Sequence, residues 1–233
     1  MTVSTRVEDL AESATRAVRS SVGDADLVKR RRSQITDASI KVFIQLGFHK
    51  ATVRDVAKKA QVSVGLIYQY YGDKDDLLFL ALLEIVEAYK REIPQSLAGI
   101  ESPLQRFIAA AKAYCRVHAS SSDATVLAYR ETASLTPDHR NIIKQHEIET
   151  NELIAQCVRD CIEAGIFEPL DVDIYTYQVI MFSHTWALKI WNLGKRMDFE
   201  DYLERGLDLL LRSALTAKGR RQLRQLDASR VNA

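Results

Sequence analysis

The sequence predicts an all-α protein, and three observations lead to this fold class. Hydrophobic residues make up 47% of the 233 residues and recur at helical spacing along most of the chain. Nine Gly and four Pro leave little room for an architecture of strands and tight turns. Ala, Leu, Glu, Lys and Arg, which all favour helices, dominate the composition. A chain of this length suggests one or two domains.

The first segment, residues 1–28, is polar and rich in Ser, Thr, Ala and Asp. Five apolar residues recur there at roughly helical spacing: Val7, Leu10, Ala14, Ala17 and Val18. We expect an N-terminal arm that is either a short helix or disordered.

The next helix is expected to begin at the basic run Lys29–Arg32 and to end at Gly47, a C-terminal cap. Its apolar stripe consists of Ile35, Ala38, Val42, Phe43 and Leu46. Ten Lys or Arg and three Asp lie in residues 29–74, a net charge of +7, whereas the whole chain carries +1 and the remainder therefore −6. A basic module on a mildly acidic body predicts a polyanionic partner for the module. The basic run is a candidate phosphate contact, or else simply a solvated run of charges.

Residues 52–74 then predict two short helices joined by a tight turn. Thr52 can cap the first helix with Asp55 in a capping-box position, and Ser63 can cap the second. Ile67 and Tyr71 lie four residues apart and are expected to face inward. The residues left outward or at the edge of the second helix are Val64, Gly65, Tyr68, Gln69 and Tyr70. Two helices that share a small core, with polar and aromatic groups facing outward, have the form of a helix-turn-helix.

The stretch TVRDVAKKAQVSVGLIYQYYGDKDDLL resembles the DNA-binding signature of the TetR/AcrR family of transcriptional regulators. The motif is long and position-specific. One residue departs from it, because Gln61 stands where the family usually has Gly and must tolerate a positive φ there. The resemblance implies a three-helix helix-turn-helix DNA-binding domain over 29–74 and a helical ligand-binding and dimerisation domain over 75–216, followed by a basic tail over 217–233.

The resemblance also implies that the second helix of the motif enters the major groove of a double-stranded operator. Val64, Gly65 and Gln69 are then the candidates to face base edges, and the others contact phosphates. The full set of expected DNA-binding residues is Thr52, Arg54, Ser63, Val64, Gly65, Tyr68, Gln69, Tyr70 and Lys74. The alternatives are that some of them are merely exposed, and that Tyr70 packs in the core.

A helix that starts near Asp73 or Asp75 and reaches about Ile93 is apolar on more than one side. Such a helix packs against two bodies, and here it would serve as a lever between the DNA-binding module and the rest. Pro94 and Gly99 are expected to stop it.

Three further helices are expected over about 103–118, 124–135 and 137–164, with Gly165 capping the last. The family resemblance implies that a small molecule binds in this body. The segments RETASLTPDHR and EAGIF are similar to ligand domains that sense acyl-CoA or other lipid-like compounds, and this similarity makes Arg130 a candidate to meet an anionic group. Candidate effector-pocket residues are Tyr114, His118, Tyr129, Arg130, His146, Phe182 and Trp186. The alternative for each is an ordinary packed core residue.

The last two strong helices, over 171–192 and 198–215, carry more apolar surface than one subunit can cover. Gly206 is small enough to allow close helix approach. A two-fold four-helix interface would cover this surface, in agreement with the homodimer that the resemblance implies. The tail after Thr216 is basic and polar, and we expect it to fray.

Catalysis finds no support, since the sequence has neither a Gly-rich phosphate loop nor a nucleophile elbow. We therefore expect no enzyme activity, no cofactor and no metal. Cys157 and Cys161 have a spacing that can ligate a metal, but a buried core pair is the favoured interpretation. Three Cys, no secretory signal and no apolar run long enough for a bilayer predict a cytoplasmic protein.

These observations predict a ligand-responsive repressor, released from a palindromic operator when a small apolar or amphipathic molecule binds the second domain. An acyl-CoA-like compound is one candidate effector. The alternative function is a small-molecule-binding helical protein whose basic module docks an acidic protein partner.

Overall fold

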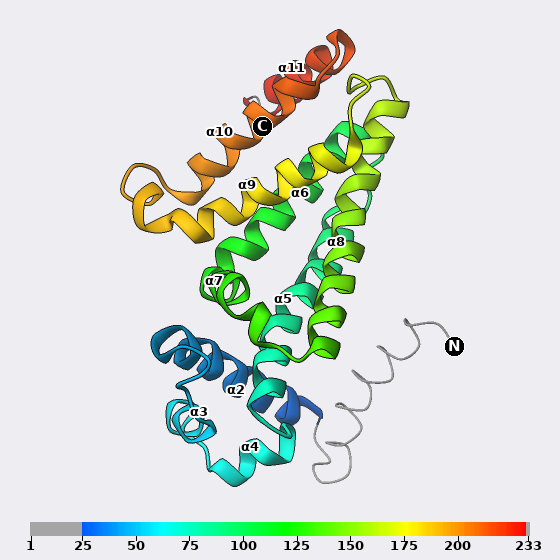
Figure 1. Ribbon diagram of the computed structural model, residues 1–233. Helices are drawn as coiled ribbons and strands as arrows, with labels where there is room; N and C mark the ends of the chain where they lie inside the picture. Colours follow the sequence, from blue (N-terminus) through cyan, green and yellow to red (C-terminus); the bar gives the residue numbers. More distant parts are fainter. Residues whose placement is uncertain (1–24, 232–233) are drawn as a thin grey trace, which may run out of the picture. The chain divides into compact units, whose positions relative to one another are not determined.

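The structure, a computed structural model, describes residues 25–231 (Figure 1). The arm expected over 1–28 lies almost wholly outside this range. The described residues form α-helices joined by short connections and contain no strand, as the sequence predicts. The elements are α2 (Ala25–Leu46), α3 (Val53–Ala60), α4 (Val64–Tyr70), α5 (Lys74–Ser96), α6 (Pro103–Ser120), α7 (Ser122–Glu131), the 3₁₀ turn η1 (Thr132–Ser134), α8 (Pro137–Glu163), α9 (Val172–Leu193), α10 (Phe199–Ala214) and α11 (Ala217–Val231).

The helices group into two compact units, each described here by itself. Unit 1 holds the described residues up to Glu84 together with Val126–Gln145. Unit 2 holds Ile85–Thr125 and the described residues from His146 onward. Helices α5, α7 and α8 each contribute residues to both units. The domain boundary expected at 74/75 stays a prediction, but the contacts group the first half of α5 with the helix-turn-helix.

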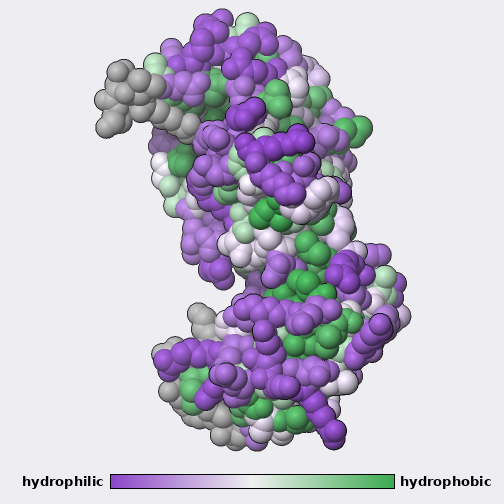
Figure 2. All heavy atoms as spheres, turned by 90° about the vertical axis from the view of Figure 1, so that its left-hand side faces the viewer, coloured by the Kyte–Doolittle hydropathy of each residue, from purple (hydrophilic) through white to green (hydrophobic). Residues whose placement is uncertain are grey.

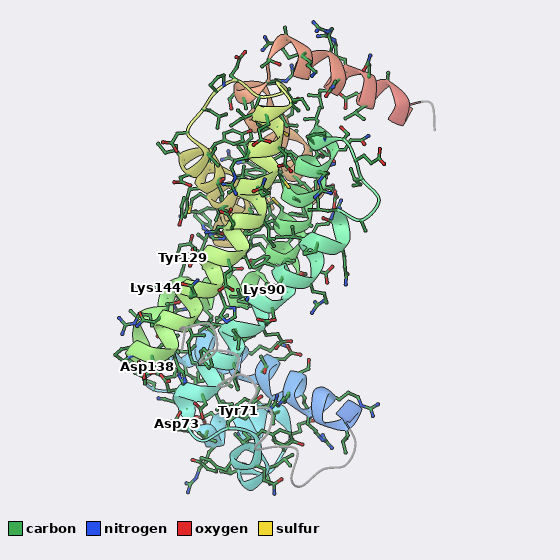
Figure 3. The ribbon with its side chains drawn as sticks, turned by 90° about the vertical axis from the view of Figure 1, so that its right-hand side faces the viewer. Tyr71, Asp73, Lys90, Tyr129, Asp138 and Lys144 are labelled. Carbon is green, nitrogen blue, oxygen red and sulfur yellow. The ribbon has the colours of Figure 1, made fainter. Side chains whose placement is uncertain are left out.

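Unit 1 is built on α2, which packs against α3. Ile35 and Phe43 on α2 are fully buried, as the stripe predicts. Gln34 Nε2 donates to the Ala60 carbonyl at 2.7 Å and so ties α2 to the end of α3. Tyr71 is buried with its hydroxyl 3.5 Å from Thr36 Oγ1; Figure 3 labels it beside the turn after α4. These contacts hold the two short helices on one support.

Two helix boundaries differ from the sequence-based expectation. Helix α2 begins at Ala25 rather than at Lys29. Helix α5 continues past Pro94 to Ser96, so the expectation that Pro94 stops it was wrong. A proline removes the hydrogen bond that its N–H would donate to the carbonyl four residues earlier, and only two residues of the helix follow Pro94. Gly99, with φ +73°, then turns the chain.

Unit 2 is organised around α6, which contacts α9, α10 and α11. The Phe107 and Phe167 rings meet edge to face, with centroids 5.1 Å apart. Helices α9 and α10 approach closely where Gly206 faces Phe182, since a Cβ at Gly206 would lie 2.0 Å from that ring. The sequence-based expectation for Gly206 is thus confirmed. No helix within residues 25–231 is long and apolar enough to cross a membrane.

The tail after Thr216 forms a helix, α11, so the expectation that it frays was wrong. Its first turn docks on the end of α8, where a Cβ at Gly219 would lie only 2.3 Å from the Ile166 carbonyl oxygen. Lys218 Nζ donates to the Ala164 carbonyl and an Arg220 guanidinium nitrogen donates to the Leu215 carbonyl, each at 2.7 Å. The cations thus bind carbonyls left free where α8 and α10 end. The polar composition of the tail did not predict this contact.

Candidate nucleic-acid interface and ligand site

The turn between α3 and α4 has the geometry that the sequence predicts. Thr52 and Asp55 form a reciprocal capping box, in which the Asp55 N–H donates to Thr52 Oγ1 at 3.2 Å and the Thr52 N–H donates to Asp55 Oδ2 at 2.9 Å. The Thr52 hydroxyl also donates to Asp55 Oδ2, at 2.6 Å, and this bond, followed by that from the Thr52 N–H, lowers the pKa of the Asp55 carboxyl. Gln61 adopts the left-handed conformation, with φ +56°, and Ser63 Oγ accepts from the Leu66 N–H at 3.0 Å. Both ends of the turn are therefore fixed by local hydrogen bonds.

The inner faces of the two helices are buried together. Val56, Ala57 and Ala60 of α3 are buried, as are Ile67 of α4 and the following Tyr71. The expectation that Ile67 and Tyr71 lie in the core is confirmed. Because α4 is held from this side, its opposite face is presented rigidly to a partner.

Eight of the nine expected DNA-binding residues reach the surface, counting the half-buried Lys74 that is described below. Tyr68 is 55% exposed, Gln69 and Gly65 are exposed, and Val64 is half-buried. The remaining three, Thr52, Arg54 and Ser63, are also exposed. The fold itself does not require a glycine at 65, since a Cβ there would meet only Ser63 Oγ within 4 Å, at 3.9 Å. The missing side chain leaves room for another molecule to approach the backbone.

Tyr70 does not lie outward. It is only 7% exposed, so the expected outward placement was wrong and the alternative of core packing holds. The physical reason is spacing, because Tyr70 lies three residues after the buried Ile67 and shares its face of the helix.

Lys74 is engaged within unit 1. Its Nζ donates to the carbonyls of Phe48, His49 and Ala51 at 2.8, 3.3 and 3.2 Å, and lies 4.5 Å from the centre of the Phe48 ring. The side chain therefore closes the loop between α2 and α3. Its expected contact with DNA stays a prediction.

We expect Lys74→Met to lower the free energy of unfolding by about 1–3 kcal/mol, because it removes charge-assisted hydrogen bonds from three carbonyls. Urea unfolding followed by circular dichroism measures this. Lys58→Met, at an exposed position of α3, is the matched control and should change stability by less than about 0.5 kcal/mol. If stability is unchanged and the salt dependence of DNA binding becomes weaker, Lys74 instead contacts a DNA phosphate.

The connection between α7 and α8 also belongs to unit 1, which the sequence did not reveal. Asp75 Oδ1 accepts from the Thr136 N–H at 3.0 Å, and the Asp75 carboxylate also bonds His139 Nδ1. The His139 ring stacks on Phe79, with centroids 4.1 Å apart. Glu131 Oε1 accepts from the Phe48 N–H at 3.4 Å. The partners are at least 60 residues apart along the chain, so no local pattern predicts them.

Two of the expected pocket residues, Tyr114 and His118, lie together in the core of unit 2. Tyr89 stacks on Tyr114, with ring centroids 4.4 Å apart and planes 6° from parallel, and its hydroxyl bonds His118 Nε2. On the other side of the ring, His118 Nδ1 lies 2.8 Å from Thr125 Oγ1. Burial, helped by nearby His184, holds the pKa of His118 well below its ordinary value.

The other five expected pocket residues lie in different surroundings. Phe182 and Trp186 pack against α10, with centroids 4.7 and 5.2 Å from the Tyr202 ring. His146 bonds Lys90, which also donates to Glu149 at 2.8 Å; burial and then the charge of Lys90 lower the pKa of His146.

Tyr129 and Arg130 belong to unit 1 and are exposed, with an Arg130 guanidinium nitrogen 3.4 Å from the Ile44 carbonyl. Their place in one pocket with the candidates of unit 2 stays a prediction. Only the Tyr114–His118 pair forms a buried polar cluster of the kind expected.

All three cysteines are buried free thiols, as expected for core residues. Burial raises the pKa of Cys115 and Cys161 to about 12 and that of Cys157 to about 11. Thiols with such pKa values stay protonated at neutral pH and are poor nucleophiles.

Two parts of the chain match models of known families. Residues 35–81 match the model described as bacterial regulatory proteins, tetR family, and residues 101–191 match that of a tetracyclin repressor-like C-terminal domain. The HTH-type transcriptional regulator HbdR of Aromatoleum sp. (strain CIB) is 42% identical over 217 residues, which cover 93% of this chain and 95% of the relative.

Two solved structures share the fold. A tetR-family regulatory protein from Rhodococcus RHA1 has a TM-score of 0.73 at 23% identity, covering 80% of this chain and 98% of that one. AibR, solved in complex with isovaleryl coenzyme A and operator DNA, has a TM-score of 0.68 at 15% identity, covering 78% of this chain and 98% of that one. At these identities the likeness concerns the fold alone.

Proposed function

The chain belongs to the TetR family of bacterial regulatory proteins, and on this basis we propose that it represses transcription from a near-palindromic operator until a small molecule binds unit 2. The observation that carries the proposal is the outer face of α4. It is exposed, it is held from behind by buried Ile67 and Tyr71, and it is open at Gly65. Such a face suits insertion into a DNA groove.

The DNA contacts follow from the side chains on that face. Gln69 can pair with an adenine edge, and Val64 can contact a thymine methyl group. Arg54 and Tyr68 offer a guanidinium and a hydroxyl to phosphates. The base-reading surface is small, so the spacing of two half-sites supplies much of the specificity.

We expect Gln69→Ala to change sequence preference by about 1–3 kcal/mol at one base position, because it removes a base contact. Arg54→Ala should weaken all sequences alike and reduce the salt slope by about one, because it removes a phosphate contact. Selection from random duplexes and salt titrations measure the two effects. Lys195→Ala, which removes an exposed cation from unit 2, should change neither. Equal shifts in sequence preference from Arg54→Ala and Gln69→Ala would contradict these assignments.

A homodimer formed through α9 and α10 would present two copies of the outer face of α4. Ile174, Tyr177 and Met181 lie on one face of α9 and are exposed, and Trp191 is exposed near its end. Leu209 on α10 is 71% exposed. Apolar side chains reach the surface on the face shown in Figure 2. A two-fold interface would bury them and place two α4 helices against successive major grooves.

The proposed effector is apolar or amphipathic, as the buried aromatic cluster around Tyr114 and His118 suggests. AibR, which shares the fold, was solved with isovaleryl coenzyme A, so an acyl-CoA-like compound fits this class. To release the operator, the effector must bind the DNA-incompetent state more tightly than the competent one. We propose that helices α5 and α8, which contribute residues to both units, transmit the conformational change from the effector to the DNA-binding helices.

Footprinting on duplexes selected from a random pool tests the proposal. We expect a protected near-palindrome and a log affinity that falls steeply with log salt. No protected palindrome at any salt concentration would contradict the repressor function. If random DNA fails to displace an acidic protein bound to unit 1, the alternative of a protein-docking module would be favoured instead.

A further inference from the structure

Four helices place a polar and aromatic cluster in the interior of unit 2. Tyr89 comes from α5, Tyr114 and His118 from α6, Asn151 from α8 and His184 from α9. The His118 and His184 ring centroids are 4.1 Å apart, and those of Tyr114 and His184 are 6.2 Å apart. Tyr114 Oη donates to Asn151 Oδ1 at 3.4 Å. The cluster is therefore continuous from α5 to α9.

The His118 ring is fully hydrogen-bonded. His118 Nδ1 lies 2.8 Å from Thr125 Oγ1, and His118 Nε2 is bonded to the Tyr89 hydroxyl, so both ring nitrogens have partners within the protein. This side of the cluster is satisfied by the protein alone and needs no ligand.

Asn151 is different. Its side chain is 6% exposed and its oxygen is bonded by Tyr114, but Nδ2 is buried without a hydrogen-bond partner. A buried amide nitrogen without a partner forfeits the hydrogen bonds that it makes in water, so native proteins rarely retain one without a reason. A ligand acceptor would provide the missing partner.

The surroundings restrict the charge of that ligand. Burial lowers the pKa of His184 to about 4 and also holds the pKa of His118 well below its ordinary value, so both imidazoles are neutral near pH 7. The other members, Tyr89, Tyr114 and Asn151, are uncharged as well. A buried anion would thus lack a counter-charge in the cluster, whereas a neutral acceptor needs none.

We propose that Asn151 Nδ2 donates a hydrogen bond to the carbonyl oxygen of the effector, and that the effector is an uncharged carbonyl compound at this point: a ketone, ester, amide or thioester. The group attached to the carbonyl would contact the aromatic rings beside Asn151, of which Tyr114 is bonded to the Asn151 side chain. This assignment rests on the proposed function, in which unit 2 binds the effector.

Acetophenone and ethylbenzene are matched probes, because they differ only in the carbonyl oxygen beside the ring. Their dissociation constants are measured with the full-length protein by ligand-observed NMR. In Asn151→Leu, which keeps the size of the side chain, acetophenone should bind about fivefold more weakly and ethylbenzene within about twofold of wild type. Thr150→Val is the control, since Thr150 is buried on the same helix but its hydroxyl already donates to the Glu147 carbonyl. It should leave the ratio of the two constants unchanged.

The proposal is overturned if neither probe binds, if Asn151→Leu leaves the ratio unchanged, or if Thr150→Val changes it equally. A structural role for Asn151 is tested separately by thermal unfolding without probe. Asn151→Leu removes the unpaired nitrogen but also the acceptor of the Tyr114 hydroxyl, so the midpoint should fall by no more than about 8 °C, and a larger drop would overturn the proposal. Operator binding measured on the same samples separates the repressor function from the role of Asn151. If the wild-type protein binds the operator but does not prefer acetophenone, the repressor function stands and only the assignment of Asn151 is lost.

Discussion

Replacing Ile174 and Met181 together by Glu should convert the proposed dimer into monomers and lower operator affinity by more than about 100-fold. The two residues lie two turns apart on one face of α9 and are 62% and 45% exposed. Each Glu would place an unpaired charge in the two-fold interface, and the symmetry places that charge there once from each subunit. A monomer would bind one half-site and lose the avidity of two linked sites.

Sedimentation velocity gives the oligomeric state, and fluorescence anisotropy with labelled operator gives the affinity. Gln156→Glu adds a charge at an exposed position of α8 and should change neither. If the double variant remains dimeric, α9 does not form the interface. If it is monomeric and still binds the operator with wild-type affinity, the proposed two-site recognition is wrong.

Acidification from pH 7 to pH 5 should lower the free energy of unfolding by about 2 kcal/mol through His184 alone. Burial lowers the pKa of this histidine to about 4 in the folded protein, against an ordinary value of 6.5. Below pH 6.5 the unfolded chain therefore binds a proton that the folded protein does not. Stability is complete above this pH, falls as the pH drops, and stops falling through His184 near pH 4. His118 shifts in the same direction and adds to the loss.

Urea unfolding at pH 7, 6 and 5 measures the effect. His184→Gln should reduce the pH dependence by about 2 kcal/mol over this range, because the variant cannot take up the proton in either state. His49→Gln, at an exposed position of unit 1, is the control and should leave the dependence close to wild type. Identical pH profiles for wild type and His184→Gln would show that His184 is not held neutral by the fold.

Short-range patterns in the sequence were sufficient to predict the helix-turn-helix. Thr52, Gln61 and Ser63 act through hydrogen bonds or dihedral angles within a few residues, and these are visible in a local pattern. The core positions Ile67 and Tyr71 followed from helical spacing. Tyr70 did not, because its position three residues after Ile67 is compatible with either the core or the edge of so short a helix.

The features that the sequence did not predict depend on distant contacts. Helix α11 docks through Gly219 against the Ile166 carbonyl, more than 50 residues earlier in the chain. Asp75 meets Thr136 and His139, and neither partner can be identified from spacing. Likewise, the expected pocket mixed residues of both units, since a polar group on an apolar stripe looks the same whether it faces a cluster, as His118 does, or a neighbouring helix.

The sequence discontinuity of unit 1 limits how this regulator can be re-engineered. A fragment ending at Glu84 would carry the whole helix-turn-helix but would lack the Thr136 and His139 partners of Asp75, and Glu131 beside Phe48. A chimeric sensor made by a single cut in α5 would therefore combine this helix-turn-helix with the α7–α8 connection of another protein. Grafting Val126–Gln145 along with the N-terminal segment would keep these contacts, so the transplantable reader consists of two separate stretches of chain.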